Sequence, residues 1–205
     1  MTNWKETLLN PIFKGNPITV LVLGICSSLA VTVQLKGAFV MALSVTVVTG
    51  LSSFVVSMMR NSIPNRIRII VQLVVVALMV ILVDQVLKAY AYSISKTLSV
   101  YIGLIITNCI VMGRIEAYAL GNKPLPSLLD GLANGAGYGL VLIVVAFFRE
   151  LLGSGTLFGF RIIPESFYEA GYMNNGLMFL PPMALILLGC IIWIQRSIQK
   201  DLQEK

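Results

Sequence analysis

Six long apolar stretches constrain the fold of this chain more than any other feature of its sequence. Each approaches the length of about 20 residues that an α-helix needs to cross the hydrocarbon core of a bilayer. Turn-forming residues, mostly proline, asparagine and glycine, fall between them. The stretches cover Ile18–Gln34, Ala38–Met59, Ile67–Leu87, Ser99–Ala119, Leu132–Leu152 and Leu177–Gln195. The sequence therefore predicts an all-α integral membrane protein with six transmembrane helices.

The composition excludes a water-soluble fold. Only 12% of the residues are charged, against about 25% in soluble domains. Six helices and their loops use nearly all of the 205 residues, so we expect residues 1–205 to form a single polytopic domain in the lipid bilayer. No room remains for a domain that binds NADH, ATP or a flavin. The net charge of +6 comes mostly from loops, which favours membrane orientation over nucleic-acid binding, and no nucleic-acid partner is expected.

The distribution of lysine and arginine predicts the orientation of the chain. Six spans place both chain ends on one side of the membrane. Ten of the 15 lysine and arginine residues fall on that side, and the other five are Lys36, Lys88, Lys96, Arg149 and Arg161. Because positively charged loops are retained in the cytoplasm, both termini are expected there.

The order of the segments indicates two halves of three spans each, about residues 10–93 and 94–198. Three is an odd number, so the second half would insert upside down relative to the first. The two halves would then be inverted repeats, related by a pseudo-two-fold axis in the membrane plane. In folds of this kind, interrupted segments at corresponding positions point to the functional site. Here the matching pair is the first and the fourth segment.

Each of these two segments carries a cysteine beside residues that weaken a helix. The first reads Leu23-Gly24-Ile25-Cys26-Ser27-Ser28, and the second reads Thr107-Asn108-Cys109-Ile110-Val111-Met112-Gly113. Glycine, serine, threonine and asparagine have lower helix propensity than alanine or leucine, and broken backbone at membrane depth is tolerated only where protein covers it. We therefore expect broken half-helices in the first and fourth spans, and a symmetry axis that brings Cys26 and Cys109 together.

Two paired thiolates in a dry site suit a soft metal centre such as an iron–sulfur cluster. A [2Fe–2S] cluster needs four ligands, usually cysteines, and this chain offers two in register, so a second, homologous chain would supply the rest. The alternative is that Cys26 and Cys109 are packing residues, because a free cysteine behaves as a small hydrophobe. Spacing alone favours this alternative, and Cys190 has no matching partner.

Several ionisable residues lie in or beside the spans. Asp84 and Asp130 are candidates for a cation route, since charges in lipid are costly and usually face a partner or a water-filled path. The alternative places them at the membrane interface. Arg149 and Glu150 are adjacent and cannot face each other on a helix, so we expect them to pair with other segments. Finally, the spacing of Gly131, Gly135 and Gly139 predicts a close approach between helices.

Three strings of this sequence resemble the signatures of one protein family. They are Ser99–Arg114, which contains the Thr-Asn-Cys motif, Val83–Tyr90 and Phe147–Gly155. The family comprises the small membrane subunits of the sodium-pumping NADH:quinone oxidoreductase and of the related Rnf complex, and the chain is most similar to its D-type members. The resemblance extends from Asn10-Pro11 to the last span.

The resemblance implies a role in a six-subunit complex of the bacterial inner membrane. That complex passes electrons from NADH to ubiquinone and exports Na⁺. The D-type and E-type members of the family are homologous and oppositely oriented, and they share one [2Fe–2S] cluster near the membrane midplane. The cluster relays electrons from the NADH-oxidising subunit to the FMN of the C-type subunit. FAD, FMN, riboflavin and ubiquinone belong to the other subunits, which are A, B, C and F beside E.

By this resemblance, Cys26 and Cys109 are cluster ligands and the E-type subunit supplies the other two. Gly24, Ser27, Thr107 and Asn108 form the cluster environment, where polar side chains and backbone N–H groups would hydrogen-bond the sulfurs and tune the potential.

Two alternatives remain open at this point. The first is the equivalent subunit of an Rnf complex, which links ferredoxin and NAD⁺ and keeps the same fold and cluster. The second is a secondary transporter built from inverted repeats of three helices each. It would use Asp84 and the broken helices to bind an ion or solute, and it would need no iron.

Overall fold

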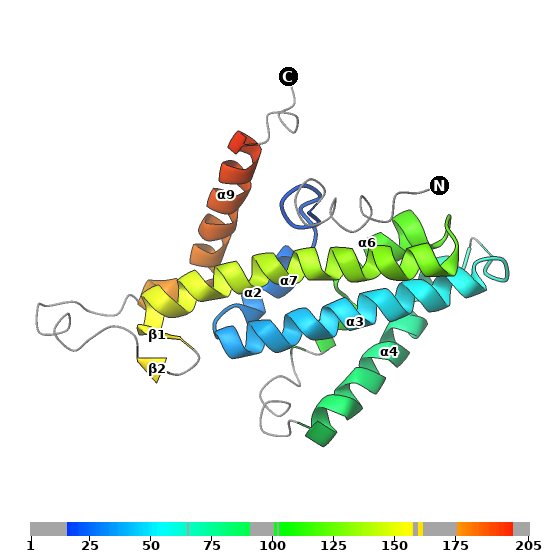
Figure 1. The fold of residues 1–205 in the computed structure, drawn as a ribbon, viewed down its shortest axis with the longest axis horizontal. Coiled ribbons are helices and arrows are strands. Elements are labelled where there is room, and N and C mark those ends of the chain that lie inside the picture. Colours follow the sequence, from blue (N-terminus) through cyan, green and yellow to red (C-terminus); the bar gives the residue numbers. More distant parts are fainter. Residues whose placement is uncertain are drawn as a thin grey trace, which may run out of the picture.

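The computed structural model describes residues 16–64, 66–90, 101, 103–157, 160–161 and 176–198. Within these ranges the chain is almost entirely helical (Figure 1). The α-helices are α2 (Ile25–Val31), α3 (Leu35–Met59), α4 (Arg68–Tyr90), α6 (Cys109–Arg114), α7 (Pro124–Ser154) and α9 (Pro181–Ile198). A π-helix, η1 (Ile115–Ala119), follows α6, and a 3₁₀-helix, η2 (Gly176–Phe179), precedes α9. The strands β1 (Thr156–Leu157) and β2 (Phe160–Arg161) form a small antiparallel pair.

Four of these helices are long and apolar enough to cross a membrane, namely α3, α4, α7 and α9. They correspond to the second, third, fifth and sixth predicted segments, which confirms the all-α membrane fold. The other two predicted spans contain short helices among the described residues. Seven residues form α2 and six form α6. The predicted boundary between the halves, near residues 93–94, lies outside the described residues.

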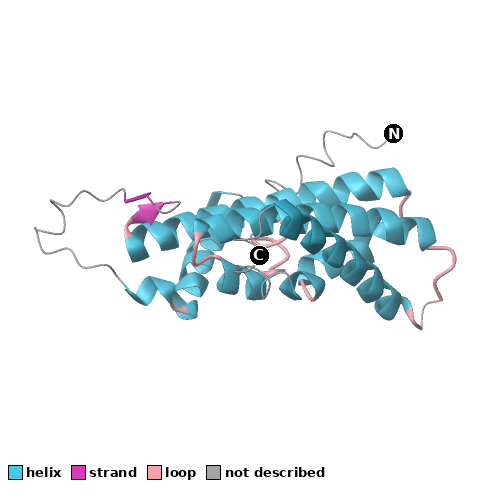
Figure 2. Cartoon of the chain, turned by 90° about the horizontal axis from the view of Figure 1, so that it is seen from below, coloured by secondary structure: helices cyan, strands magenta, loops and turns pink. Residues whose placement is uncertain are grey.

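The core of the molecule is the antiparallel pair α3 and α7, which pack along their length and lie side by side in Figure 1. Figure 2 shows the two short strands at one end of the helical body. A Cβ atom added at Gly135 would lie 2.6 Å from the Cα of Thr46, and one at Gly139 would lie 2.8 Å from the Cβ of Ala42. At Gly131, an added Cβ would lie 2.9 Å from the Cα of Gly50. The three glycines therefore let the two backbones approach closely, as their spacing predicted.

Helices α4 and α9 lie on opposite sides of this pair (Figure 1). Little of their apolar surface is covered by the chain itself, since 22% of the most apolar window of α4 and 11% of that of α9 is buried. The corresponding shares are 56% in α3 and 61% in α7. The outer faces of α4 and α9 carry large aliphatic side chains such as Ile70, Val74 and Ile186, which suits contact with lipid or with other membrane proteins.

Both short helices begin at a break in the backbone, as predicted for the first and fourth spans. Gly24 precedes α2 with φ +79°, in the left-handed region that glycine adopts without steric cost. Asn108 precedes α6, and its side-chain oxygen accepts a hydrogen bond from the backbone N–H of Ile110 at 3.1 Å. This is the N-cap interaction that favours asparagine at a helix start. Residues 103–106 are helical and Thr107 lies in a turn, so the fourth segment is interrupted beside Cys109.

Candidate functional site

The two cysteine-bearing breaks are in direct contact. Asn108 Nδ2 donates a hydrogen bond to Ser27 Oγ at 3.2 Å. A Cβ atom added at Gly24 would lie 2.6 Å from Cδ1 of Ile110. Cys26 is next to Ser27 in the chain, and Cys109 lies between Asn108 and Ile110. We call residues 24–28 and 107–110 the cysteine junction.

The thiols lie on the surface of the chain, whereas most of their neighbours are inside it. Cys26 and Cys109 are free and exposed. Ser27, Asn108 and Ile110 are each at most 5% exposed. The junction therefore has a packed inner side, which fixes the backbone. On its outer side the two cysteines are exposed and can contact a molecule outside this chain. Thr107, also predicted to belong to the site, is exposed on the surface beside them.

A tyrosine that the sequence did not single out is the third member of the junction. Tyr138 of α7 is fully buried, and its hydroxyl lies 2.6 Å from Ser27 Oγ. Its ring also packs against the first break, because a Cβ atom at Gly24 would lie 3.0 Å from Tyr138 Cε2. One residue earlier in α7, the carbonyl of Gly137 accepts a hydrogen bond from Asn16 Nδ2 at 3.0 Å. The first broken segment is thus held on α7 at residues 137 and 138.

Asp130, predicted to be on a cation route, is buried and paired with an arginine. It is 4% exposed. Arg114 binds both carboxylate oxygens, with Nη2 2.6 Å from Oδ1 and Nε 3.0 Å from Oδ2. Asn134 Nδ2 donates a further hydrogen bond to Oδ1 at 3.1 Å. Arg114 is the last residue of α6 and Cys109 is the first, so one short helix joins the cysteine junction to this ion pair.

Asp84, the second candidate for the cation route, lies in a different environment. It is on α4, where Oδ2 is 2.5 Å from Nζ of Lys88 one turn later. Its other oxygen, Oδ1, is buried and has no hydrogen-bond partner among the described residues. In the described part of the chain, Asp84 and Asp130 therefore have separate basic partners, Lys88 and Arg114.

Arg149 and Glu150 pair with other segments, as their adjacency predicted. Arg149 is fully buried. Its Nη1 donates to Thr32 Oγ1 at 2.6 Å and to the carbonyl of Leu29 in α2 at 3.2 Å. Its Nε and Nη2 donate to the carbonyls of Met178 and Phe179 in η2, each at 3.0 Å. A cation at helix C-termini is favoured by the direction of the helix dipole.

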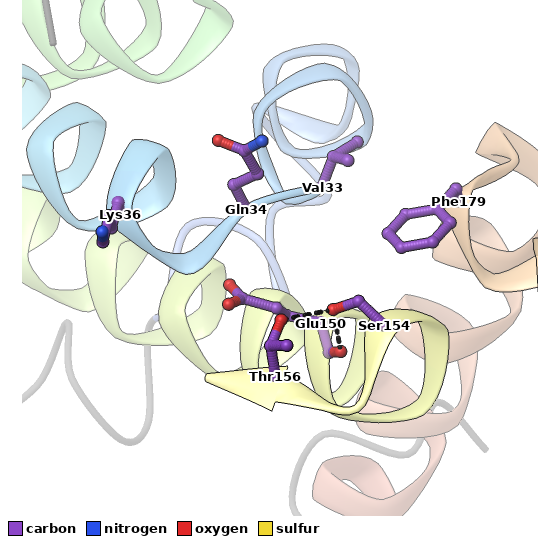
Figure 3. Close-up of a pocket in the computed structure, with 7 residues that line it drawn as sticks. All are labelled: Val33, Gln34, Lys36, Glu150, Ser154, Thr156 and Phe179. Carbon is purple, nitrogen blue, oxygen red and sulfur yellow. Dashed lines mark hydrogen bonds between the residues drawn. The ribbon is translucent and has the colours of Figure 1, made fainter. Parts of the chain in front are cut away.

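Glu150 has the complementary position. Its Oε2 accepts a hydrogen bond from the backbone N–H of Leu35, at the N-terminus of α3, at 2.5 Å. Beside it lies a pocket of about 330 Å³ at the end of α7 (Figure 3). The pocket is lined by Val33, Gln34, Lys36, Glu150, Ser154, Thr156 and Phe179. Glu150 is twelve residues beyond Tyr138 along α7, which corresponds to about 18 Å, so this pocket is distinct from the cysteine junction.

Comparison with known proteins identifies the family. The family model described as "Rnf-Nqr subunit, membrane protein" matches residues 4–192. The D subunit of a "Na(+)-translocating NADH-quinone reductase" from Haemophilus influenzae is 58% identical over 205 residues, which is 100% of this chain and 98% of that protein. A protein of the same description from Aeromonas hydrophila is 59% identical over 193 residues, or 94% of this chain and 92% of that protein. The chain therefore belongs to the Rnf-Nqr family of membrane subunits, and within it to the group of D subunits of Na⁺-translocating NADH-quinone reductases.

Proposed function

We propose that this chain holds half of an intramembrane [2Fe–2S] cluster in a Na⁺-translocating NADH:ubiquinone reductase. The observation that carries the proposal is the cysteine junction itself. Two breaks, far apart in the sequence, pack against each other through Ser27 and Asn108, while the adjoining thiols of Cys26 and Cys109 are exposed. Thiols that only filled space in the core would point inward. Thiols on the outer side of a rigid contact are placed to bind something shared with a neighbour.

The donor set fits such a cluster, but only in part. Cysteine thiolates are the usual ligands of [2Fe–2S] centres, which need four. In the described part of the chain, no group of three or more histidine, cysteine, aspartate or glutamate side chains could hold a metal ion. The chain thus offers two sulfur ligands and requires two more from a partner. The homologous E-type subunit is the partner we propose, with the A, B, C and F subunits completing the complex.

The depth of the junction supports a relay across the membrane. Tyr138, which contacts both Gly24 and Ser27, lies at the middle of the 31 residues of α7. The junction is therefore near the centre of the span. When bound there, the cluster would supply one-electron redox chemistry that divides a path across about 30 Å of hydrocarbon. The residues of this chain hold the two thiols at that depth, between the NADH-oxidising subunit on the cytoplasmic side and the FMN of the C-type subunit on the outer side.

We propose further that the chain is built from two inverted repeats. Helices α3 and α7 start at Leu35 and Pro124, which are 89 residues apart. The same interval separates Thr46 from Gly135, which pack on each other. It also relates Arg60 to Arg149. The Nη1 of Arg60 donates to the carbonyl of Asn122, just before α7, and that of Arg149 donates to Thr32, just before α3.

One interval therefore relates the starts of the two helices, their central contact and the contacts at both ends. A pseudo-two-fold axis at Thr46 and Gly135 produces this pattern. Such inverted halves agree with a multi-pass chain of the bacterial inner membrane with both termini in the cytoplasm.

Asp84 and Asp130 are the residues we propose for the Na⁺ path. Both are acidic groups of membrane-spanning helices, where a charge is costly and commonly functional. Arg114 occupies both oxygens of Asp130, so a cation could use this carboxylate only after the guanidinium moves away. The substitutions Asp84→Asn and Asp130→Asn in the complete complex test this role. We expect a lower number of Na⁺ ions exported per electron, and an unchanged ratio in both variants would refute it.

Electron paramagnetic resonance with iron quantitation tests the cluster. The complete reduced complex is compared with Cys26→Ser and Cys109→Ser variants, after confirming that all subunits remain. Cys190→Ser is the matched control, because Cys190 is also a free, exposed thiol but lies on α9. We expect the two junction variants, and not the control, to lose one iron–sulfur signal and two iron atoms. Unchanged iron and quinone reduction in both would reject the ligand role and favour a transporter.

A further inference from the structure

Among the described contacts of the cysteine junction, Tyr138 is the one side chain of α7 that forms a hydrogen bond with the first break and also packs against it. It is fully buried. A buried tyrosine needs a partner for its hydroxyl, and here that partner is Ser27, which is adjacent to Cys26 in the chain. The contact places a polar group of the central helix one residue from a proposed cluster ligand.

The hydrogen bonds of Ser27 fix the direction of this contact. Its Oγ donates its single proton to the carbonyl of Gly24 at 3.0 Å. Asn108 Nδ2 donates to the same oxygen at 3.2 Å. A serine hydroxyl has one proton and two lone pairs, so at 2.6 Å the Tyr138 hydroxyl must be the donor. The one proton and both lone pairs of the Ser27 hydroxyl are then used in hydrogen bonds. These bonds hold the serine between α7, the Gly24 turn and the Asn108 turn.

The residue of the other central helix that corresponds to Tyr138 does not make such a hydrogen bond. The residue 89 positions before Tyr138 is Thr49 of α3. Its hydroxyl donates its only proton to the carbonyl of Val45, one turn back in the same helix, at 2.6 Å. It therefore has no proton to donate to the junction. The two cysteine-bearing turns are held from the α7 side by a hydrogen bond that the α3 counterpart cannot make.

We infer that Tyr138 is a positioning residue for the [2Fe–2S] cluster. Its hydroxyl, acting through Ser27, fixes the turn that carries Cys26 against the turn that carries Cys109, and so sets the separation of the two thiolates that this chain contributes. The inference rests on the proposed function, because it requires both cysteines to be ligands. It assigns Ser27 to holding the backbone, since a hydroxyl with all its positions used has no proton left for a sulfur atom.

The variant Tyr138→Phe in the complete complex tests this role. Phenylalanine keeps the ring that packs on Gly24 and removes only the donor. Tyr101→Phe is the control, because Tyr101 is a partly buried tyrosine that packs against the hydrophobic core outside residues 24–28 and 107–110. We expect Tyr138→Phe to retain its iron and to show altered g-values and a shifted midpoint potential for the intramembrane cluster alone. The cluster of the NADH-oxidising subunit should be unchanged, and the control should match the wild type.

A double-mutant cycle with Ser27→Ala separates positioning from general loosening of the core. If the hydroxyl acts through Ser27, Tyr138→Phe should cause no further spectroscopic change in the Ser27→Ala complex. Ser27→Ala also breaks the same hydrogen bond from its other end, which keeps the test available if Tyr138→Phe does not assemble. Additive changes, or a Tyr138→Phe spectrum and potential identical to the wild type, would overturn the inference. Those results would leave the ligand role intact, because only the cysteine variants decide that role.

Discussion

Replacing Gly135 by alanine should separate the two central helices. The added Cβ would lie 2.6 Å from the Cα of Thr46, whereas carbon atoms in contact are about 3.5–4.0 Å apart. The neighbour is backbone and cannot rotate away, so α3 and α7 would have to part by about 1 Å. Overpacking of this kind costs about 1–3 kcal/mol, against a gain of about 1 kcal/mol from the higher helix propensity of alanine.

Gly189→Ala provides the matched control for this change. Gly189 is also inside a membrane-spanning helix, α9, but an added Cβ meets no atom within 4 Å. The control should therefore show only the propensity gain of about 1 kcal/mol. Gly135→Ala should fall below the wild type by up to about 2 kcal/mol, after the propensity gain is subtracted from the packing cost.

The free energies of unfolding can be compared by titrating the protein in mild detergent micelles with sodium dodecyl sulfate and following helix content by circular dichroism. The two substitutions should have opposite signs. If Gly135→Ala is as stable as Gly189→Ala, the close contact between α3 and α7 is refuted, and with it the position of the proposed axis at Thr46 and Gly135.

Two further predictions concern buried charges. Arg114→Gln leaves Asp130 buried without its cation, which should lower the free energy of unfolding by about 3–5 kcal/mol. Adding Asp130→Asn should recover most of this loss in the same unfolding measurement. Simple additivity of the two changes would contradict the pairing. Arg149→Lys keeps the charge but replaces a planar group with five N–H donors by one with three. It should raise the rate of amide hydrogen exchange at Thr32 and Leu35, at the two ends of the turn between α2 and α3. Unchanged exchange there would show that the four hydrogen bonds of Arg149 do not hold this turn.

Much of the fold follows from the sequence because the bilayer leaves few choices. An apolar run of sufficient length in lipid must satisfy its backbone as a helix, so α3, α4, α7 and α9 were predictable. The two breaks were predictable from glycine and asparagine beside the cysteines. The start of α7 was predicted too late, at Leu132 instead of Pro124. Prolines at 124 and 126 look like a loop, but proline is well tolerated in the first helical turn.

The internal contacts of the site were harder to predict. Nothing in the sequence distinguishes Tyr138 from any aromatic residue in an apolar helix, because its role depends on which segment folds over it. The partner of Asp130 was equally hard to predict, because Arg114 ends α6, and η1 and a loop separate it from α7 in the chain. The π-helix η1, which follows Arg114, also has no simple sequence signature. Local propensity predicts where the chain breaks, whereas the meeting of two breaks is decided by tertiary packing.

The length of α7 has a consequence for how the protein meets its membrane. Its 31 residues extend over about 46 Å, which exceeds a hydrocarbon core of about 30 Å and matches the full thickness of a bilayer with its headgroups. With Tyr138 at the middle, Arg149 lies about 17 Å and Glu150 about 18 Å towards one surface, and Asp130 lies about 12 Å towards the other. The helix thus sets the depth of these groups in the membrane. Its charged side chains lie close to the two headgroup layers, and its apolar middle lies at the depth of the cysteine junction. In a thinner bilayer α7 would have to tilt, and the cysteine junction, which is fastened to its midpoint, would tilt with it.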